Sequence, residues 1–229
     1  MAKLPNDKCY QADTLRRTVI KFGLGAGMLL TGGACSKAQT QGNSLWTPRQ
    51  TEGPFYPVQQ QADKDVDLTM IDGHSERAKG QVIRVQGRVL DTNGEILTNA
   101  FVEIWQANSE GKYRHPRDPN NAPIDPNFQG WGQTNTSAQG RYGFKTIKPG
   151  AYPAGPDWTR PPHIHFKAAK DGFASLTTQM YFPDEQLNNI DRILQSLTEP
   201  EQRMVIAKRQ TGDAGEPVFQ FDIVLRRAT

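Results

Sequence analysis

The sequence is poor in the residues that most often cross-link a protein or bind its metals. Its 229 residues include two cysteines, Cys9 and Cys35, and four histidines. Both cysteines come before residue 36, so a domain that follows them has no disulfide. Any metal in that domain has to be held by His, Tyr, Asp or Glu rather than by a thiolate. With so few histidines, two that stand close together indicate a candidate metal site.

Long hydrophobic runs are also missing. A transmembrane helix needs about 20 apolar residues, and the nearest candidate, residues 19–30, is shorter and rich in glycine. Basic residues precede or open this run, and the small residues 31–35 end it. This layout is typical of a signal peptide. We therefore expect residues 1–35 to be a signal peptide rather than part of the fold.

The leader carries two further signals. Residues 16–21 (RRTVIK) resemble the twin-arginine export signal, a route that carries proteins already folded. Residues 33–35 resemble the end of a lipoprotein signal, although Gly32 stands where leucine is usual. We expect an exported protein, periplasmic or secreted. Lipidation of Cys35, which would anchor the chain to a membrane, stays open beside plain cleavage.

Excess charge of one sign is confined to this leader. Residues 1–37 hold six Lys or Arg and two Asp, which gives +4, whereas the whole chain carries +3. The remainder is therefore close to −1, and the basic character belongs to the leader. Nucleic-acid binding needs a basic surface. The charge distribution therefore does not favour a nucleic acid as a partner.

The residues after the leader, about 190 of them, are enough for one domain with a full core. Residues 36–80 are polar and irregular, and we expect them to form an ordered arm over that core. From residue 81 apolar and polar positions alternate, which predicts a strand. Further strands are predicted at residues 100–107, 142–146, 163–168, 176–182 and 218–226. Short strands broken by Gly, Pro and Asn favour an all-β fold, a β-sandwich over residues 81–229.

Two segments depart from the strand pattern. Residues 199–209 predict one short helix in the C-terminal half, because Thr198 can cap it and Pro200 suits its first turn. Residues 111–140 are expected to form a long loop. Loops of this length are uncommon in a domain of this size and usually build a site.

His163 and His165 stand one residue apart in the strand predicted at 163–168. Successive side chains of a strand point to opposite faces, so both imidazoles project from one face. Such a pair is either a polar strand face or a metal site, and the pattern alone leaves both open. Tyr113 and Tyr152 each lie in a turn flanked by glycine and proline. Taken singly, either tyrosine could merely cover an edge of the sheet.

Taken together, these segments are similar to those of a known family. The matching segments are residues 51–57, 102–108, 111–115, 125–128, 146–150, 160–166, 178–182 and 221–223. They resemble, in the same order, the intradiol ring-cleavage dioxygenases, in particular the protocatechuate 3,4-dioxygenase group. The resemblance covers nearly all of the chain after the leader and implies the β-sandwich of that family.

The resemblance implies one non-haem Fe(III) held by Tyr113, Tyr152, His163 and His165. The residue types suit this metal, because phenolate is a hard anionic donor that favours ferric over ferrous iron. Two phenolates and one hydroxide nearly neutralise the ion, and two neutral imidazoles complete the set. The implied partners are a small aromatic diol and O2.

The implied reaction breaks the bond between the two hydroxylated carbons of a catechol and gives a cis,cis-muconate, with no external reductant. Tyr152 is expected to leave the metal and accept a substrate proton. Arg160 matches a family arginine that stabilises developing negative charge, and a surface arginine is the alternative reading. The remaining pocket residues carried over from the family are Gly53, Pro54 and Gln179.

Two departures from the family pattern concern the substrate and the assembly. Ala154 stands where the protocatechuate enzymes commonly place a pocket tryptophan, and Trp158 is displaced along the sequence. A pocket changed here could accept a different catechol. Residues 36–80 are too short and polar for the helical dimerisation domain of catechol 1,2-dioxygenases. This points to the simpler architecture, and a homo-oligomer stays open.

Two other readings compete with this one. His115, His163 and His165 could form a three-histidine zinc or copper site, but no carboxylate stands out as its acid or base. An exported β-sandwich could also be a binding or structural module without catalysis, since this fold serves many functions. Such a module has no reason to retain four ligand positions and Arg160. Phenolate-to-iron charge transfer would colour the enzyme, and the module would be colourless.

Overall fold

The computed structural model describes residues 46–59, 61, 63–213 and 215–228. The expected signal peptide at 1–35, its twin-arginine segment and Cys35 all lie outside the described residues. Of the expected arm at 36–80, the structure describes the part from Trp46 onward, except residues 60 and 62. In the part of the chain that is described, no helix is both long and apolar enough to cross a membrane.

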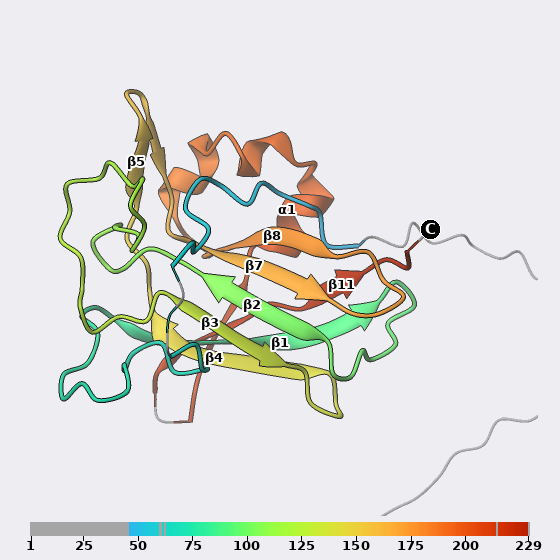
Figure 1. The fold of residues 1–229 in the computed structure, drawn as a ribbon. Coiled ribbons are helices and arrows are strands. Elements are labelled where there is room, and N and C mark those ends of the chain that lie inside the picture. The colour runs from blue at the N-terminus through green and yellow to red at the C-terminus, as the bar shows by residue number, and fades with distance from the viewer. Residues whose placement is uncertain (1–45, 60, 62, 214, 229) are drawn as a thin grey trace, which may run out of the picture. The chain divides into compact units, whose positions relative to one another are not determined.

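The first sheet is built around β1 (Val82–Asp91), whose positions alternate between buried and more exposed as predicted. It pairs antiparallel with β4 (Arg141–Ile147) on one side. On the other side it pairs parallel with β10 (Pro217–Gln220) and then β11 (Ile223–Leu225). β9 (Lys208–Thr211) extends the sheet beside β10. A single long strand therefore organises this half of the fold (Figure 1).

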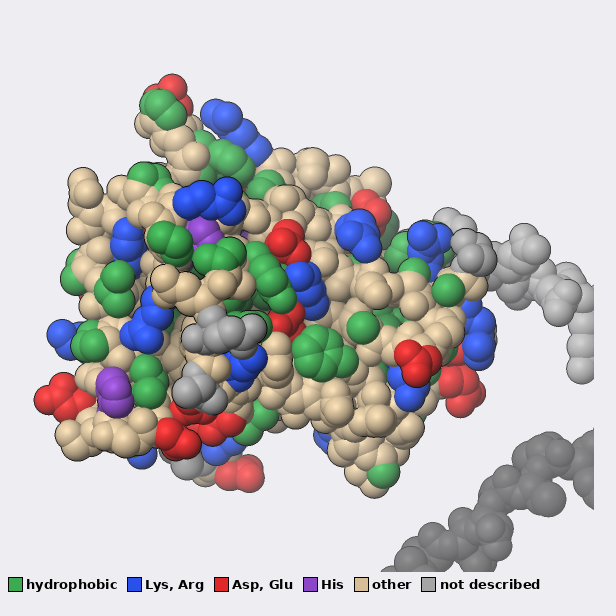
Figure 2. Space-filling view, in the orientation of Figure 1, with side chains coloured by type: hydrophobic (Ala, Val, Ile, Leu, Met, Phe, Trp, Pro, Cys, Tyr) green, Lys and Arg blue, Asp and Glu red, His purple; other side chains and the backbone are tan. Residues whose placement is uncertain are grey.

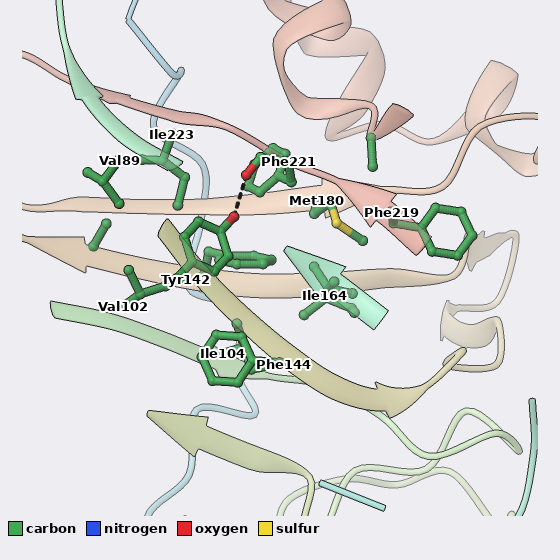
Figure 3. Packing of buried hydrophobic residues seen from close by; sticks show 14 of the residues in the cluster. Val89, Val102, Ile104, Tyr142, Phe144, Ile164, Met180, Phe219, Phe221 and Ile223 are labelled. Atoms are coloured by element: carbon green, nitrogen blue, oxygen red, sulfur yellow. Dashed lines mark hydrogen bonds between the residues drawn. The ribbon is translucent and has the colours of Figure 1, made fainter. Parts of the chain in front are cut away.

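The second sheet is entirely antiparallel. Its order is β3 (Trp131–Asn135), β2 (Phe101–Trp105), β7 (His163–Ala169) and β8 (Leu176–Tyr181). Apolar residues of both sheets form one buried cluster between them, as Figure 3 shows for Ile104 and Ile164 against Phe144 and Phe219. Each such side chain contributes about 1.5–3 kcal/mol when fully buried. The predicted β-sandwich is confirmed.

The outer face of the second sheet is buried as well. Because side chains alternate along a strand, Ile164 and Phe166 point into the sandwich while His163 and His165 point away from it. The residues before β1 cover these histidines: Gln50 donates its backbone N–H to the carbonyl of Thr177 on β8 (2.9 Å). The first four positions of β7, His163–Phe166, are therefore all buried.

The predicted helix is present but shorter than expected. Helix α1 (Glu199–Val205) begins at the predicted place, where the backbone N–H of Thr198 donates to the Glu201 carboxylate (2.8 Å). Its expected end at 209 is wrong. Ile206 is extended and bridges to Tyr181, and the residues after it form β9 beside β10. Pairing with the sheet thus overrides helix propensity.

Other elements lie in stretches that were not assigned. The expected loop at 111–140 contains the strand β3, and the 3-10 helices η1 (Gln186–Ile190) and η2 (Leu194–Ser196) precede α1. β5 (Tyr152–Gly155) and β6 (Trp158–Arg160) form a hairpin that projects from the body of the sheets in Figure 1. Tyr152 pairs with Arg160 across this hairpin. Two predicted site residues therefore share one element.

Candidate active site

The two histidines converge as the strand period predicts. The Nε2 atoms of His163 and His165 are 3.2 Å apart, and both side chains are buried. The Nδ1 of His163 lies 2.7 Å from the carbonyl oxygen of Pro161, an acceptor, so this nitrogen carries the proton. The Nε2 lone pair of His163 is then free for another partner.

The two tyrosine turns are held in contact by a glycine. Gly111 has φ +76°, and a Cβ at this position would lie 2.3 Å from the carbonyl oxygen of Ala151. A residue with a side chain cannot take its place. The backbone N–H of Tyr113 also donates to the Asp118 carboxylate (2.7 Å), which anchors the first turn. The turns that carry Tyr113 and Tyr152 therefore meet although they are distant in sequence.

The four rings form a closed circuit. Ring centroids are 5.4 Å apart for Tyr113 and Tyr152, and 5.6 Å for Tyr152 and His163. They are 4.9 Å apart for His163 and His165, and 6.2 Å for His165 and Tyr113. The structure thus brings together all four residues that the family resemblance named as ligands.

Burial keeps these four groups uncharged in the protein alone. It raises the pKa of Tyr113 well above its ordinary value, and it raises the pKa of Tyr152 against the opposing charge of Arg160. Burial and then the charge of Arg160 lower the pKa of His163 well below its ordinary value. The same two causes lower the pKa of His165 to about 3. At neutral pH the site offers two phenols and two imidazole lone pairs.

This donor set fits one metal ion. The Tyr113 hydroxyl is buried, and the side chain that interacts with it is that of Tyr152, another of the four expected ligands. A cation lowers the pKa of a group that coordinates it, and so converts phenol into phenolate. The residues therefore fit a hard cation bound by two tyrosine oxygens and two histidine nitrogens.

The three-histidine alternative does not assemble. Among the described residues, no group of three or more His, Cys, Asp or Glu is placed to hold a metal ion. His115 is buried, but its Nδ1 accepts the backbone N–H of Arg117 (3.1 Å) and its ring packs against Phe55. The zinc or copper reading with His115, His163 and His165 therefore has no support in the structure.

Arg160 is a buried side chain and not a surface arginine. Its Nε donates to the Oδ2 of Asp191 (2.7 Å). Its Nη2 donates to the Oε1 of Gln179 (2.7 Å) and to the hydroxyl of Tyr181 (3.1 Å). Gln179 is fully buried and also donates to the carbonyl of Thr51 (2.9 Å). Gln179 therefore acts on the site through Arg160 and the arm.

A cavity of about 500 Å³ opens beside Tyr152 and Arg160. Of the described residues that line it, Arg160 is the one that carries a charge. The apolar part of its wall comes from Pro54, Phe55, Pro119, Pro153, Ala154, Trp158 and Ile193. This size and character are typical of a small-molecule site. Ala154 and Trp158, the two residues at which the sequence departs from the expected family pattern, both line this wall.

Gly53 and Pro54 lie on the cavity wall as expected. Gly53 has φ +74°, and a Cβ there would lie 3.4 Å from the Cε1 of His165. A left-handed φ favours glycine, and so does the close approach to the histidine ring. The arm therefore packs directly on one of the expected ligands.

Sequence reasoning missed three residues around these rings. The Trp105 ring stacks on His165 with centroids 4.8 Å apart and an interplanar angle of 11°. The ring centroids of Phe55 and Tyr113 are 5.0 Å apart, and the Asp191 carboxylate forms an ion pair with Arg160. Trp105 and Phe55 stand in segments that carry the resemblance, which is the signal that could have found them. Asp191 stands in none of those segments.

The β-sandwich and its two-tyrosine, two-histidine site define the class of intradiol ring-cleavage dioxygenases. The family model described as Dioxygenase matches residues 51–227. The chain therefore belongs to this dioxygenase family, and the resemblance seen in its sequence segments is confirmed.

Individual relatives agree with this assignment. The chain is 44% identical over 184 residues to the protocatechuate 3,4-dioxygenase beta chain of Burkholderia cepacia, covering 78% of each chain. It is 31% identical over 186 residues to the corresponding alpha chain of Pseudomonas putida, covering 77% of this chain and 90% of that one. The solved dioxygenase domain of a dioxygenase and carbohydrate-binding fusion from Streptomyces sp. SirexAA-E has a TM-score of 0.58 and 28% identity, covering 80% of this chain and 99% of that one.

Proposed function

We propose that the protein is a non-haem Fe(III) dioxygenase that cleaves a catechol-type diol between its two hydroxylated carbons. Both atoms of O2 enter the product, a cis,cis-muconate, so the reaction needs no external reductant. The observation that carries the proposal is the closed circuit of Tyr113, Tyr152, His163 and His165 next to an apolar cavity.

Tyr113, Tyr152, His163 and His165 would hold the iron. When bound, Fe(III) supplies the Lewis acidity and the redox chemistry that let a coordinated catechol react with O2. The protein supplies the donor types and their enclosure. The Pro161 carbonyl fixes the tautomer of His163, and the stacked Trp105 ring fixes the plane of His165.

The two tyrosines have different surroundings and therefore different roles. Tyr152 lies on the cavity wall, whereas Tyr113 is enclosed behind it. A catechol that enters the cavity carries two hydroxyl protons, and with the metal bound the oxygen of Tyr152 would accept one of them. Arg160, paired with Tyr152 across the hairpin, stabilises the negative charge that develops on the diol.

The cavity supports a ring substrate without specifying its substituents. Its apolar wall suits an aromatic face, and Arg160 supplies the charge of one guanidinium. The relatives named for protocatechuate support a catechol of that class as the substrate. Ala154 and Trp158 change the wall from the expected family pattern, so the pocket could accept a catechol with a different substituent.

Two further proposals concern the whole chain. We propose that it is exported by the twin-arginine route, with removal of the leader or lipidation of Cys35, which rests on residues 16–21 and 33–35. We also propose that it works as an oligomer, of itself or with a related chain. The support is that the relative of Burkholderia cepacia is named as the beta chain of an enzyme that also has an alpha chain.

A visible absorption spectrum tests the iron site. The iron-loaded protein is expected to show a broad visible band from phenolate-to-iron charge transfer, which shifts when catechol or protocatechuate is added without O2. Tyr113→Phe and Tyr152→Phe should each weaken or move the band, because each removes one phenolate donor. Tyr142→Phe is the matched control, since Tyr142 is buried but bonds to the Phe221 carbonyl in the core (Figure 3).

The outcomes separate the alternatives. A band that needs both Tyr113 and Tyr152 and shifts with one catechol supports the site and ranks the substrates. A colourless protein with measured iron occupancy contradicts the two-tyrosine assignment. That result would favour the interpretation of the protein as a binding or structural module without catalysis.

A further inference from the structure

The guanidinium of Arg160 has a limited number of hydrogen-bond donors. An arginine has five N–H groups: one on Nε and two on each of the terminal nitrogens. In this structure Nε is engaged by Asp191, and Nη2 is engaged by Gln179 and Tyr181. None of these three partners takes an N–H group of Nη1, and the Arg160 side chain also interacts with the hydroxyl of Tyr152. Because Arg160 lines the cavity together with Tyr152, the Nη1 edge is the one left to face a substrate.

Asp191 is built into the fold on both sides of its carboxylate. Its Oδ2 accepts from Arg160, and its Oδ1 accepts the backbone N–H of Leu194 at the start of η2 (2.8 Å). The side chain has no exposed surface. A carboxylate held in this way has one orientation available, so the arginine that it binds also has one. Asp191 thus ties η2 to Arg160, 31 residues away in the sequence.

We propose that Asp191 is a positioning residue of the proposed reaction: it holds Arg160 so that its Nη1 edge faces the diol beside Tyr152. The inference rests on the proposed function and adds a residue that no family segment contains. The pair also makes the arginine tolerable, because a buried charge without a partner is strongly destabilising. A guanidinium that could turn would lose its alignment with the charge that it stabilises.

A purely structural role is the alternative, since Asp191 also binds the start of η2. The two roles predict different couplings. A structural carboxylate affects activity to the same extent whatever residue stands at 160. A carboxylate that acts through Arg160 has no effect once the guanidinium is gone. The test therefore uses both sites.

The experiment compares Asp191→Asn, Arg160→Gln and the double variant, each in the full iron-loaded chain. The readouts are kcat and KM for catechol, the catechol affinity from the spectral shift without O2, and the thermal unfolding midpoint of the metal-free protein. Asp91→Asn is the matched control. Asp91 is also a buried carboxylate that accepts backbone N–H groups, those of Asn93 and Glu95, and it is the last residue of β1.

We expect Asp191→Asn to lower kcat/KM by about 10- to 100-fold, as loss of a supporting hydrogen bond at a site commonly does. Catechol affinity should fall in the same direction, and Asp91→Asn should leave both unchanged. In the Arg160→Gln background, adding Asp191→Asn should change kcat/KM by less than about threefold. Asp191→Glu, which keeps the charge, should recover part of the loss.

The double variant also keeps the test usable if the Asp191→Asn protein does not fold. If Asp191→Asn alone unfolds because Arg160 is left without a partner, the double variant removes both charges and is compared with Arg160→Gln. Two outcomes overturn the inference while leaving the proposed function intact, and both require an active wild type. In the first, Asp191→Asn has the same kcat/KM as the wild type. In the second, Asp191→Asn lowers kcat/KM by the same factor in the Arg160→Gln background as in the wild type. A wild type that binds no catechol overturns the proposed function and the inference with it.

Discussion

His163 and His165 are fully buried and have pKa values below that of free histidine. In the unfolded chain both take up a proton as the pH falls through about 6.5. In the folded chain they stay neutral, His165 down to about pH 3. The unfolded state therefore binds more protons in this window. The resulting stability is present above about pH 6.5 and is lost as the pH falls below it.

We expect the metal-free protein to lose stability steeply on acidification. Each histidine should lower the free energy of unfolding by up to about 1.4 kcal/mol per pH unit below pH 6.5. Denaturant unfolding at pH 7, 6 and 5 measures this slope. In the variant with both His163→Gln and His165→Gln, the slope should be smaller by at most about 3 kcal/mol per pH unit. Equal slopes in the two proteins would contradict neutral, buried histidines.

The residues of the site differ in how far the sequence could predict them. His163 and His165 followed from the strand period, and Tyr113 and Tyr152 followed from their turns within the family resemblance. Asp191 could not be predicted, because it has no neighbour in sequence that marks it. Its partner is 31 residues away, and only the path of the chain through η1 and η2 brings the two together.

At the level of the elements, β1 contains an inward position that no side chain can occupy. Gly87 lies on the same face of the strand as the core residues Val85 and Val89, but a Cβ there would lie 1.8 Å from the carbonyl oxygen of Phe221. This is the place where the C-terminal segment passes from β10 to β11, and Phe221 donates its N–H to the carbonyl of Gln86 (2.8 Å). Glycine is therefore required at position 87 because the backbone of the segment between β10 and β11 approaches β1 too closely for a side chain.

Gly87→Ala should destabilise the fold by about 1–3 kcal/mol or more, because overpacking a core forces the backbone to shift. Denaturant unfolding measures the change. Gly143→Ala on the neighbouring β4 is the matched control, since its Cβ would meet nothing closer than 3.8 Å. That variant should change stability by less than about 1 kcal/mol. A Gly87→Ala protein as stable as Gly143→Ala would contradict the close approach.

The elements that were predicted well are strands in which apolar and polar residues alternate. The elements that were missed take their conformation from the segment with which they pair. The strand expected at 218–226 is two strands, because the N–H of Arg88 on β1 binds the Asp222 carboxylate (2.9 Å) in place of a ladder carbonyl. β9 is exposed along its length and has no apolar period to reveal it. Its conformation comes from pairing with β10.

At the level of the whole molecule, the distribution of charge bears on which partners the surface can attract. Acidic and basic side chains are interspersed over the face shown in Figure 2. This agrees with the charge of about −1 that remains once the leader is set aside. Long-range attraction of nucleic acid needs a field of one sign, which this face does not have.

Export is testable on the full chain. In a bacterial host with twin-arginine machinery, we expect the wild-type protein in the periplasmic or membrane fraction and the Arg16→Lys/Arg17→Lys variant in the cytoplasm. Lys3→Gln/Lys8→Gln is the control, because it removes two positive charges from the leader but keeps the arginine pair, whereas the arginine variant keeps the charge and removes the pair. Immunoblots of the fractions measure the distribution. Equal export of the arginine variant would contradict the assignment.

The contacts of the arm with the end of the chain bear on the order in which the protein is made. Thr47 and Val224 exchange two hydrogen bonds across 177 residues, and Gln50 binds Thr177. During synthesis Thr47 leaves the ribosome long before Val224 is added. The arm segment that includes Gly53 therefore cannot form all of its native contacts until synthesis is almost complete. Contacts this distant slow folding. This part of the arm is thus made early but is among the last parts of the fold to reach its final contacts.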